Sequence, residues 1–262
     1  GAVLALAYPD RIAQRRPGAA PRYQLRNGTG AALTAGDPLR DEPYLVIAET
    51  DGRRPEARIL LAARIALEEI EAAAGDQLLQ EDVVEWNDAT ASVSAERRTR
   101  LGALVLRTAP LRTPDPAAVA TALLRGIRGR GVTCLPWSDA AGGLRERIAF
   151  LRAIDPAWPD FSDEALTGAL DAWLAPRLAG VRRLTDIAGS ELTAALMERL
   201  AWDQRAALDR LAPTHITVPT GSRIPVDYSD TAAPVLAVRI QELFGLAETP
   251  AVGGGRVPLT LH

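Results

Sequence analysis

The sequence predicts an α+β protein in which a small β-barrel is followed by a mostly helical domain that ends in a β-hairpin. Three features support this prediction. Four short segments of strand-like composition lie within residues 22–64 and are separated by turn signals. Residues 138–212 carry apolar side chains at helical spacing. Residues 214–228 alternate apolar and polar side chains on both sides of a Pro-Thr-Gly-Ser turn.

The first predicted domain covers residues 1–112. Residues 1–16 are expected to form a helix that Pro9 interrupts. Six strands and one short helix are expected to follow, namely Arg22–Arg26, Gly30–Thr34, Tyr44–Thr50, Ala57–Arg64, the helix Ala66–Ala74, Asp82–Trp86 and the long strand Ser92–Leu106. A small closed or half-open barrel of OB type is the natural packing for such strands, because closure removes the edges of the sheet.

The second predicted domain covers residues 113–262 and opens with a helix over 113–131, which starts at prolines and ends in glycines. Serine, a common N-cap, begins each of three further helical segments. These segments are Ser138–Ala153, Ser162–Leu174 and Ser190–Leu211. The spacing of the tryptophans favours core packing over stacking on bases. They are Trp137, Trp158, Trp173 and Trp202. A hairpin over 214–228 and a strand followed by a helix over 234–246 complete the domain.

The residue inventory excludes several kinds of site. All 30 basic residues are arginines, so the chain has no lysine for a phosphate-binding P-loop, and we predict no catalytic residue. One cysteine and two histidines cannot form an ordinary four-ligand zinc site, so we predict no metal site. No apolar run reaches the roughly 18 residues that span a bilayer, so no membrane partner is expected. A single cysteine fits a reducing cytoplasm.

Charge is unevenly distributed, with a net charge of +4 over residues 1–40, −10 over 41–96 and +7 over 97–130. In a barrel, the long last strand could lie beside the first strands and form one basic face. The predicted nucleic-acid-binding residues are therefore Arg22, Arg26, Arg97, Arg98 and Arg100, with Tyr23 as a ring for base stacking. In the alternative interpretation, the arginines of 97–100 pair with Glu81, Asp82 and Glu85 across a sheet.

The C-terminal part carries a pattern that resembles a known family. The segments PTHITVPTGSRIPVDY (213–228), PVLAVRIQELFGL (234–246) and TPAVGGGRVPLTLH (249–262) resemble the C-terminal region of HrpB-type ATP-dependent helicases, bacterial relatives of the DEAH-box RNA helicases. The resemblance also implies an OB-type barrel beyond the helicase motor. Both ends of the chain are expected to continue in a longer protein, because the first apolar helix has no cap and the family extends past residue 262.

The resemblance implies an accessory role. The chain would contribute nucleic-acid binding, or regulation, to a motor that lies outside these residues and uses ATP and magnesium, while the chain itself needs no cofactor and is not catalytic alone. Its expected partners are its own motor domains and single-stranded RNA or DNA. The alternative is a protein-docking or scaffold module that does not bind nucleic acid.

Overall fold

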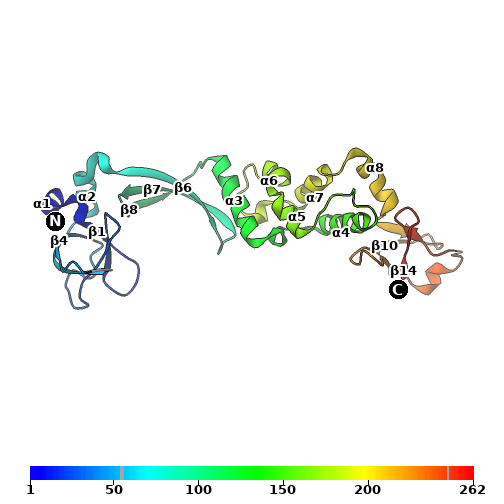
Figure 1. Ribbon diagram of the computed structural model, residues 1–262, viewed down its shortest axis with the longest axis horizontal. Coiled ribbons are helices and arrows are strands. Elements are labelled where there is room, and N and C mark those ends of the chain that lie inside the picture. The colour runs from blue at the N-terminus through cyan, green and yellow to red at the C-terminus, as the bar shows by residue number, and fades with distance from the viewer. Residues whose placement is uncertain (54–55, 247) are drawn as a thin grey trace. The chain divides into compact units, whose positions relative to one another are not determined.

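The computed structural model describes residues 1–53, 56–246 and 248–262 (Figure 1). They form two compact units, one made of Gly1–Val84 with Ser94–Pro114 and the other of Glu85–Val93 with Asp115–His262. A closed barrel, several helices and further small sheets make up the chain, which confirms the predicted α+β class. Within the described residues, no helix combines the length and the apolar character needed to cross a bilayer.

Five strands of the first unit close into a barrel in the order β1-β2-β3-β5-β4, with β4 also paired to β1. The parallel pairing of β3 with β5 lets a chain of short hairpins close on itself, as in an OB-like fold. The strands are β1 (Ile12–Arg15), β2 (Arg22–Leu25), β3 (Gly30–Ala32), β4 (Tyr44–Thr50) and β5 (Glu56–Arg64).

The predicted helix over residues 1–16 is wrong in its second half. Helix α1 (Ala2–Ala7) ends before Pro9, a 3-10 turn follows over Pro9–Arg11, and β1 then begins. Local composition favoured a helix here, but pairing with both β2 and β4 buries the β1 residues Ile12 and Ala13. Tertiary pairing therefore overrides a weak local preference.

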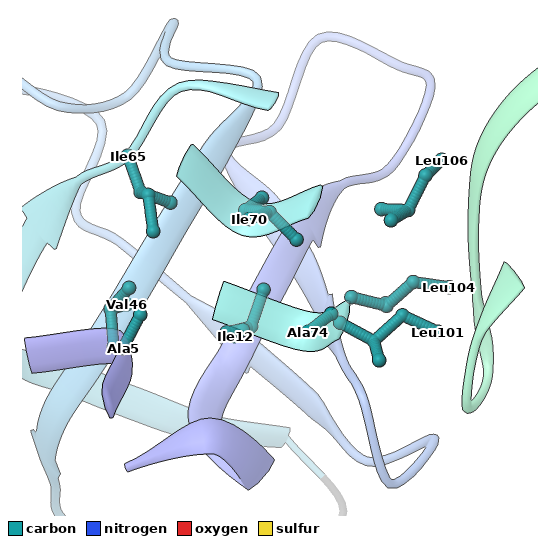
Figure 2. Packing of buried hydrophobic residues seen from close by; sticks show 9 residues of the cluster. All are labelled: Ala5, Ile12, Val46, Ile65, Ile70, Ala74, Leu101, Leu104 and Leu106. Atoms are coloured by element: carbon teal, nitrogen blue, oxygen red, sulfur yellow. The ribbon is translucent and has the colours of Figure 1, made fainter. Parts of the chain in front are cut away.

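A hydrophobic cluster packs α1 and α2 (Leu67–Ala74) against the outside of the barrel. Figure 2 shows Ala74 of α2 beside Leu101 and Leu104. The remaining members of the cluster are Ala5, Ile12, Val46, Ile65, Ile70 and Leu106. The barrel has its own interior, which is filled by Ala13, Tyr23, Leu25, Ala31, Leu33, Leu45, Ile47 and Ile59.

The last strands lie outside the barrel, contrary to the prediction. Strands β6 (Leu79–Asn87), β7 (Ser92–Leu101) and β8 (Leu104–Pro110) form a separate three-stranded sheet. The predicted long strand over residues 92–106 breaks at Gly102, whose φ of +58° reverses the chain. The Ala103 N–H donates to the Arg26 carbonyl at 2.8 Å, which fixes this turn beside the barrel. The strands predicted over residues 82–86 and 92–106 are therefore strands of this separate sheet and not of the barrel.

The second unit is mostly helical, with α3 (Pro116–Arg130), α4 (Asp139–Ile154), α5 (Asp163–Gly168), α6 (Leu170–Trp173), α7 (Gly189–Glu198) and α8 (Trp202–Leu211). The predicted serine caps are present at Ser138 and Ser162, whose hydroxyls accept from backbone N–H groups. Ser190 is not a cap, because α7 begins at Gly189. The segment that starts there is two helices, and Arg205 donates to the carbonyls of Glu198 and Leu200 at the break.

Three of the four tryptophans that were predicted to lie in the core pack as predicted. Trp158 and Trp173 are buried, and Trp137 stacks on Trp173 with the ring centroids 6.1 Å apart. Trp202 is 83% exposed at the start of α8, so the core prediction is wrong for this residue.

The predicted hairpin over residues 214–228 is present and joins a four-stranded sheet in the order β14-β11-β10-β9. Gly221 occupies the turn with a φ of +90°, as expected for a glycine corner. A 3-10 turn over Ile240–Leu243 replaces the predicted helix after β11. The strands are β9 (His215–Thr217), β10 (Arg223–Asp227), β11 (Val235–Leu236) and β14 (Thr260–Leu261), with β12 (Ala251–Val252) and β13 (Val257–Pro258) in a separate pair.

Tyr228 at the end of β10 provides a test of the second unit's stability. Its hydroxyl donates to the Pro213 carbonyl at 2.8 Å, and burial raises the pKa of Tyr228 to about 12. A pKa above the ordinary value near 10 means that the folded state holds the proton more tightly than the unfolded state. The contribution of Tyr228 to stability is therefore fully present below pH 10 and is lost as the pH rises towards 12.

We expect the free energy of unfolding to fall by about 1 kcal/mol between pH 9 and pH 11 because of Tyr228. Urea titrations followed by circular dichroism at 222 nm measure this, since most helices belong to the second unit. The variant Tyr228→Phe should be less stable at pH 9 but should lose less stability on going to pH 11. An equal pH dependence in both proteins would contradict the assignment to Tyr228.

Candidate nucleic-acid interface

The outer face of β2, β3 and β5 presents polar side chains over a central strand of small residues. The strand register aligns Arg22 with Ala32 and Arg58 in one row, and Gln24 with Gly30 and Glu56 in the next. Paired residues point to the same side of a sheet, and their neighbours along each strand point to the other. Because β3 offers only Gly30 and Ala32 here, side chains of the flanking strands reach across it.

Three loops of the barrel surround an open hollow of about 730 Å³ on this side. The loops connect β1 to β2, β2 to β3 and β4 to β5. The described residues that line the hollow are Arg16, Arg22, Gly28, Thr29, Gly30, Gly52, Arg53, Glu56 and Ala57. In OB-type barrels, the face of the second and third strands together with the first and fourth loops is the surface that binds oligonucleotides. The hollow lies at the corresponding place in this barrel.

The arginines around the hollow are held loosely. Arg22 is 60% exposed at the side chain, and its Nε lies 3.3 Å from a carboxylate oxygen of Glu56. Arg53 is 85% exposed and lies 3.7 Å from Asp51. Exposed ion pairs of this kind contribute little to stability, so these guanidinium groups remain available to another anion. A phosphate could replace either carboxylate at small cost.

Asp51 shapes the loop that carries Arg53. Its Oδ1 accepts from the Arg53 N–H at 3.2 Å and from the Arg58 N–H at 2.9 Å. The backbone donors hold the pKa of Asp51 below its usual value. The Asp51 carboxylate therefore binds backbone N–H groups of its own loop and fixes the backbone at Arg53.

The other predicted residues of the barrel lie elsewhere. Arg26 faces away from the hollow, donating to Oε1 of Gln77 at 2.7 Å and lying 3.9 Å from Asp10. Tyr23 is fully buried inside the barrel, with its hydroxyl 2.9 Å from the carbonyls of Leu39 and Glu42. Burial also raises the pKa of Tyr23. Of the predicted residues on β2, the structure brings only Arg22 to the hollow.

The predicted arginines of residues 97–100 lie on β7, in a different sheet from β2, so the expected basic face shared with Arg22 does not form. Arg97 forms a bidentate ion pair with Asp82, in which Nε donates to Oδ1 at 2.6 Å and Nη2 donates to Oδ2 at 2.9 Å. These hydrogen bonds hold the pKa of Asp82 below its usual value. Arg100 donates to Glu81 at 3.0 Å. Arg98 lies 3.2 Å from Glu96. The contacts of Arg97 and Arg100 match the alternative in which acidic residues of the preceding strand pair with this arginine cluster, whereas Glu96, the partner of Arg98, lies on β7 itself.

Two arginines at the hollow were missed in the sequence. Arg16 follows β1, which was assigned to a helix, so its place in a barrel loop was hidden. Arg53 follows Asp51-Gly52, a turn signal between two predicted strands, and that position could have identified it as a loop residue. Among the described residues, no group of three or more histidine, cysteine or acidic side chains is arranged to hold a metal ion.

Two family models match the sequence. One, described as the C-terminal region of an ATP-dependent helicase, covers residues 173–262. The other, the connector region of the ATP-dependent RNA helicase HrpB, covers residues 77–111, which correspond to the three-stranded sheet β6-β7-β8.

Similar proteins cover the whole length of the chain. The ATP-dependent RNA helicase HrpB of Escherichia coli (strain K12) is 40% identical over 264 residues, a match that covers 99% of this chain and 32% of the relative. A crystal structure of the E. coli DExH-box NTPase HrpB has 40% identity and a TM-score of 0.56 over 99% of this chain and 32% of that one. A crystal structure of the E. coli DEAH/RHA helicase HrpB has 37% identity and a TM-score of 0.56 over 100% of this chain and 33% of that one.

The chain therefore spans about a third of the length of the relatives it matches. The two family models fall in separate parts of the chain, and the relatives extend the likeness to the barrel between residue 1 and the connector. These matches confirm that the chain resembles the C-terminal region of HrpB-type ATP-dependent helicases.

Proposed function

We propose that this chain is an accessory nucleic-acid-binding part of an ATP-dependent helicase, and that its barrel holds single-stranded RNA or DNA at the hollow beside β2 and β3. The observation that carries the proposal is the meeting of Arg16, Arg22 and Arg53 at the ligand-binding face of a closed OB-like barrel. ATP and magnesium would act on motor domains outside these residues. The cytoplasm is the compartment that fits such a role and a single cysteine.

The chemistry of the hollow favours the sugar-phosphate backbone over the bases. None of the described residues that line it is aromatic, so base stacking has no platform there. Arginine forks instead match the oxygen atoms of phosphate groups. Contacts with phosphate carry no sequence information and weaken with salt. The proposed binding is therefore independent of sequence and strongly dependent on ionic strength.

Glu56 would oppose this binding. Its carboxylate lies at Arg22 and over Gly30, only 3.6 Å from the position that a Cβ of residue 30 would occupy. Removing its charge should free Arg22 for a phosphate group. We expect Glu56→Gln to tighten the binding of single-stranded RNA by roughly 3- to 10-fold at low salt, corresponding to about 1 kcal/mol for an exposed charge pair.

Fluorescence anisotropy with a labelled oligouridine measures this change. Glu68→Gln is the matched control, because it removes the same charge from an exposed site on α2 of the same unit. The control should shift the affinity by less than about twofold. If both variants tighten binding equally, the effect reflects net charge and Glu56 has no special position.

A protein-docking role is favoured by a different surface. Val3 is 82% exposed and Leu6 is 70% exposed, and their spacing of three residues places both on one side of α1. Such an apolar face fits against another domain, and the motor domains of the same helicase are the partner that we propose. Val3→Glu with Leu6→Glu should abolish co-elution of the chain with a separately expressed motor and leave RNA binding unchanged. Co-elution that survives both substitutions would remove α1 from this role.

A further inference from the structure

A second cavity lies within the helical unit, away from the barrel. It has a volume of about 400 Å³ and is bounded by α4, α7, α8 and the β9–β10 hairpin. Its apolar wall is formed by Leu144, Met197, Leu208, Val226 and Tyr228. A cavity of this size holds a small organic group, and apolar walls with a few polar atoms are typical of ligand sites. Nothing in the proposed nucleic-acid function uses it.

A buried arginine faces this cavity. Arg147 of α4 is 8% exposed, the one charged residue among the buried residues that the structure describes. Its Nε donates to the Ala212 carbonyl at 2.6 Å and its Nη2 to Oδ1 of Asp209 at 2.5 Å. Within the described part of the chain, Nη1 has no protein acceptor, and Arg147 is among the residues that line the cavity. Because Arg147 lines the cavity and Nη1 is not enclosed by protein, Nη1 is free to donate to an acceptor placed in that space.

The charges around the cavity limit what that acceptor is. Asp209 is 88% exposed at its carboxylate and only partly neutralises Arg147. Asp139 and Glu146 also line the cavity, and both are exposed on α4. Three carboxylates and two arginines line the cavity, so it lacks the excess positive charge that a polyphosphate needs, and a nucleotide fits poorly. A single negative charge next to an apolar group satisfies Arg147 and the wall together.

We propose that this cavity binds an apolar carboxylate, with Nη1 of Arg147 donating to the carboxylate and with Met197, Leu208 and Val226 packing against the apolar part. Two sources share this chemistry, a free aromatic or aliphatic acid and the C-terminal residue of a peptide. Either source leaves the barrel untouched, so the proposal stands or falls independently of nucleic-acid binding.

Met197 is the single methionine of the sequence, which provides a clean probe. In the full chain prepared with Gly1 as its first residue, ¹³C-labelled methionine gives one methyl signal, located in the cavity wall. Titration with 4-phenylbutyrate should produce a saturable shift of that signal, whereas 4-phenylbutylamine, which has a similar shape and opposite charge, should not. No shift with the acid, or equal shifts with both compounds, would overturn the proposal.

Variants and a peptide refine the test. Arg147→Gln, checked for folding by circular dichroism, should weaken binding of the acid at least tenfold. Glu146→Gln removes an exposed charge without disturbing the core and should tighten binding about threefold. If Arg147→Gln does not fold, an unchanged affinity in Glu146→Gln is enough to reject the electrostatic assignment. A peptide that ends in phenylalanine distinguishes the two sources. If this peptide shifts the signal and the same peptide with a C-terminal amide does not, the ligand is a peptide terminus. If only phenylbutyrate shifts the signal, the ligand is a free acid.

Discussion

Alanine at Arg16, Arg22 and Arg53 together is expected to weaken the binding of single-stranded RNA on the order of 100-fold at low salt. The three side chains come from different loops and strands but line one hollow of the barrel. Each exposed contact with a phosphate contributes about 1 kcal/mol, and every 1.4 kcal/mol is a factor of ten in affinity. Because Arg22 and Arg53 are 60% and 85% exposed at their side chains, their removal should leave the barrel folded.

The salt dependence of the same variant is a second readout. Each phosphate contact with a single strand adds about 0.7 to the slope of log K against log salt. Loss of three contacts should therefore reduce the steepness by about 2. A fall in affinity without a change of slope would mean that the arginines act through structure and not by neutralising phosphate groups.

The β7 arginines supply a charge-matched control. Alanine at Arg97, Arg98 and Arg100 removes the same three charges, but these residues contact Asp82, Glu96 and Glu81 within the same sheet. We expect the affinity for RNA to fall less than about threefold, since arginine already engaged by a carboxylate contributes little to a phosphate track. An equal loss in both triple variants would move the binding surface to the three-stranded sheet or spread it over both.

The strand pattern of the barrel was readable because β2, β4 and β5 are bounded by turn residues and β2 alternates in burial. β4 occupies the predicted residues Tyr44–Thr50. β1 was not readable, because four residues that pair on both edges look no different in sequence from the end of an apolar helix. Its strand conformation depends on partners about 10 and 30 residues away in the chain, which local propensity does not report.

Some positions of the predicted site residues could likewise be read from the sequence, and others could not. Arg22 and Tyr23 are neighbours on one strand, so they must point to opposite faces, and only one of them can reach the outside of a barrel. The period-two rule thus held enough information to separate them. The position of Arg97 relative to Arg22 required knowing that the chain leaves the barrel after β5, so that β7 belongs to a separate sheet.

The tip of the β6–β7 hairpin belongs to the helical unit, and one glycine makes this contact possible. A Cβ added at Gly126 of α3 would lie 2.2 Å from Cδ2 of the Trp86 ring. Arg130 of the same helix lies over that ring, 5.5 Å from its centroid, and its Nε donates to Asp88 at 3.1 Å. The indole Nε1 of Trp86 also donates to Asp88, at 2.7 Å. The ring, the helix and the hairpin turn therefore form one packed contact.

Gly126→Ala is expected to lower the free energy of unfolding of the helical unit by about 2 kcal/mol, because overpacking against the ring exceeds the gain in helix propensity of about 1 kcal/mol. In a Trp86→Ala background the clash is absent, so the same change should stabilise by up to about 1 kcal/mol. The sign of the effect thus depends on Trp86, which is the signature of direct contact in a double-mutant cycle. Urea unfolding followed by circular dichroism at 222 nm measures the stability of all four proteins.

Gly129→Ala is the matched control, since no heavy atom lies within 4 Å of its added Cβ, and it should stabilise the protein in both backgrounds. If Gly126→Ala destabilises equally with and without Trp86, the tip of the hairpin does not pack on α3 as described.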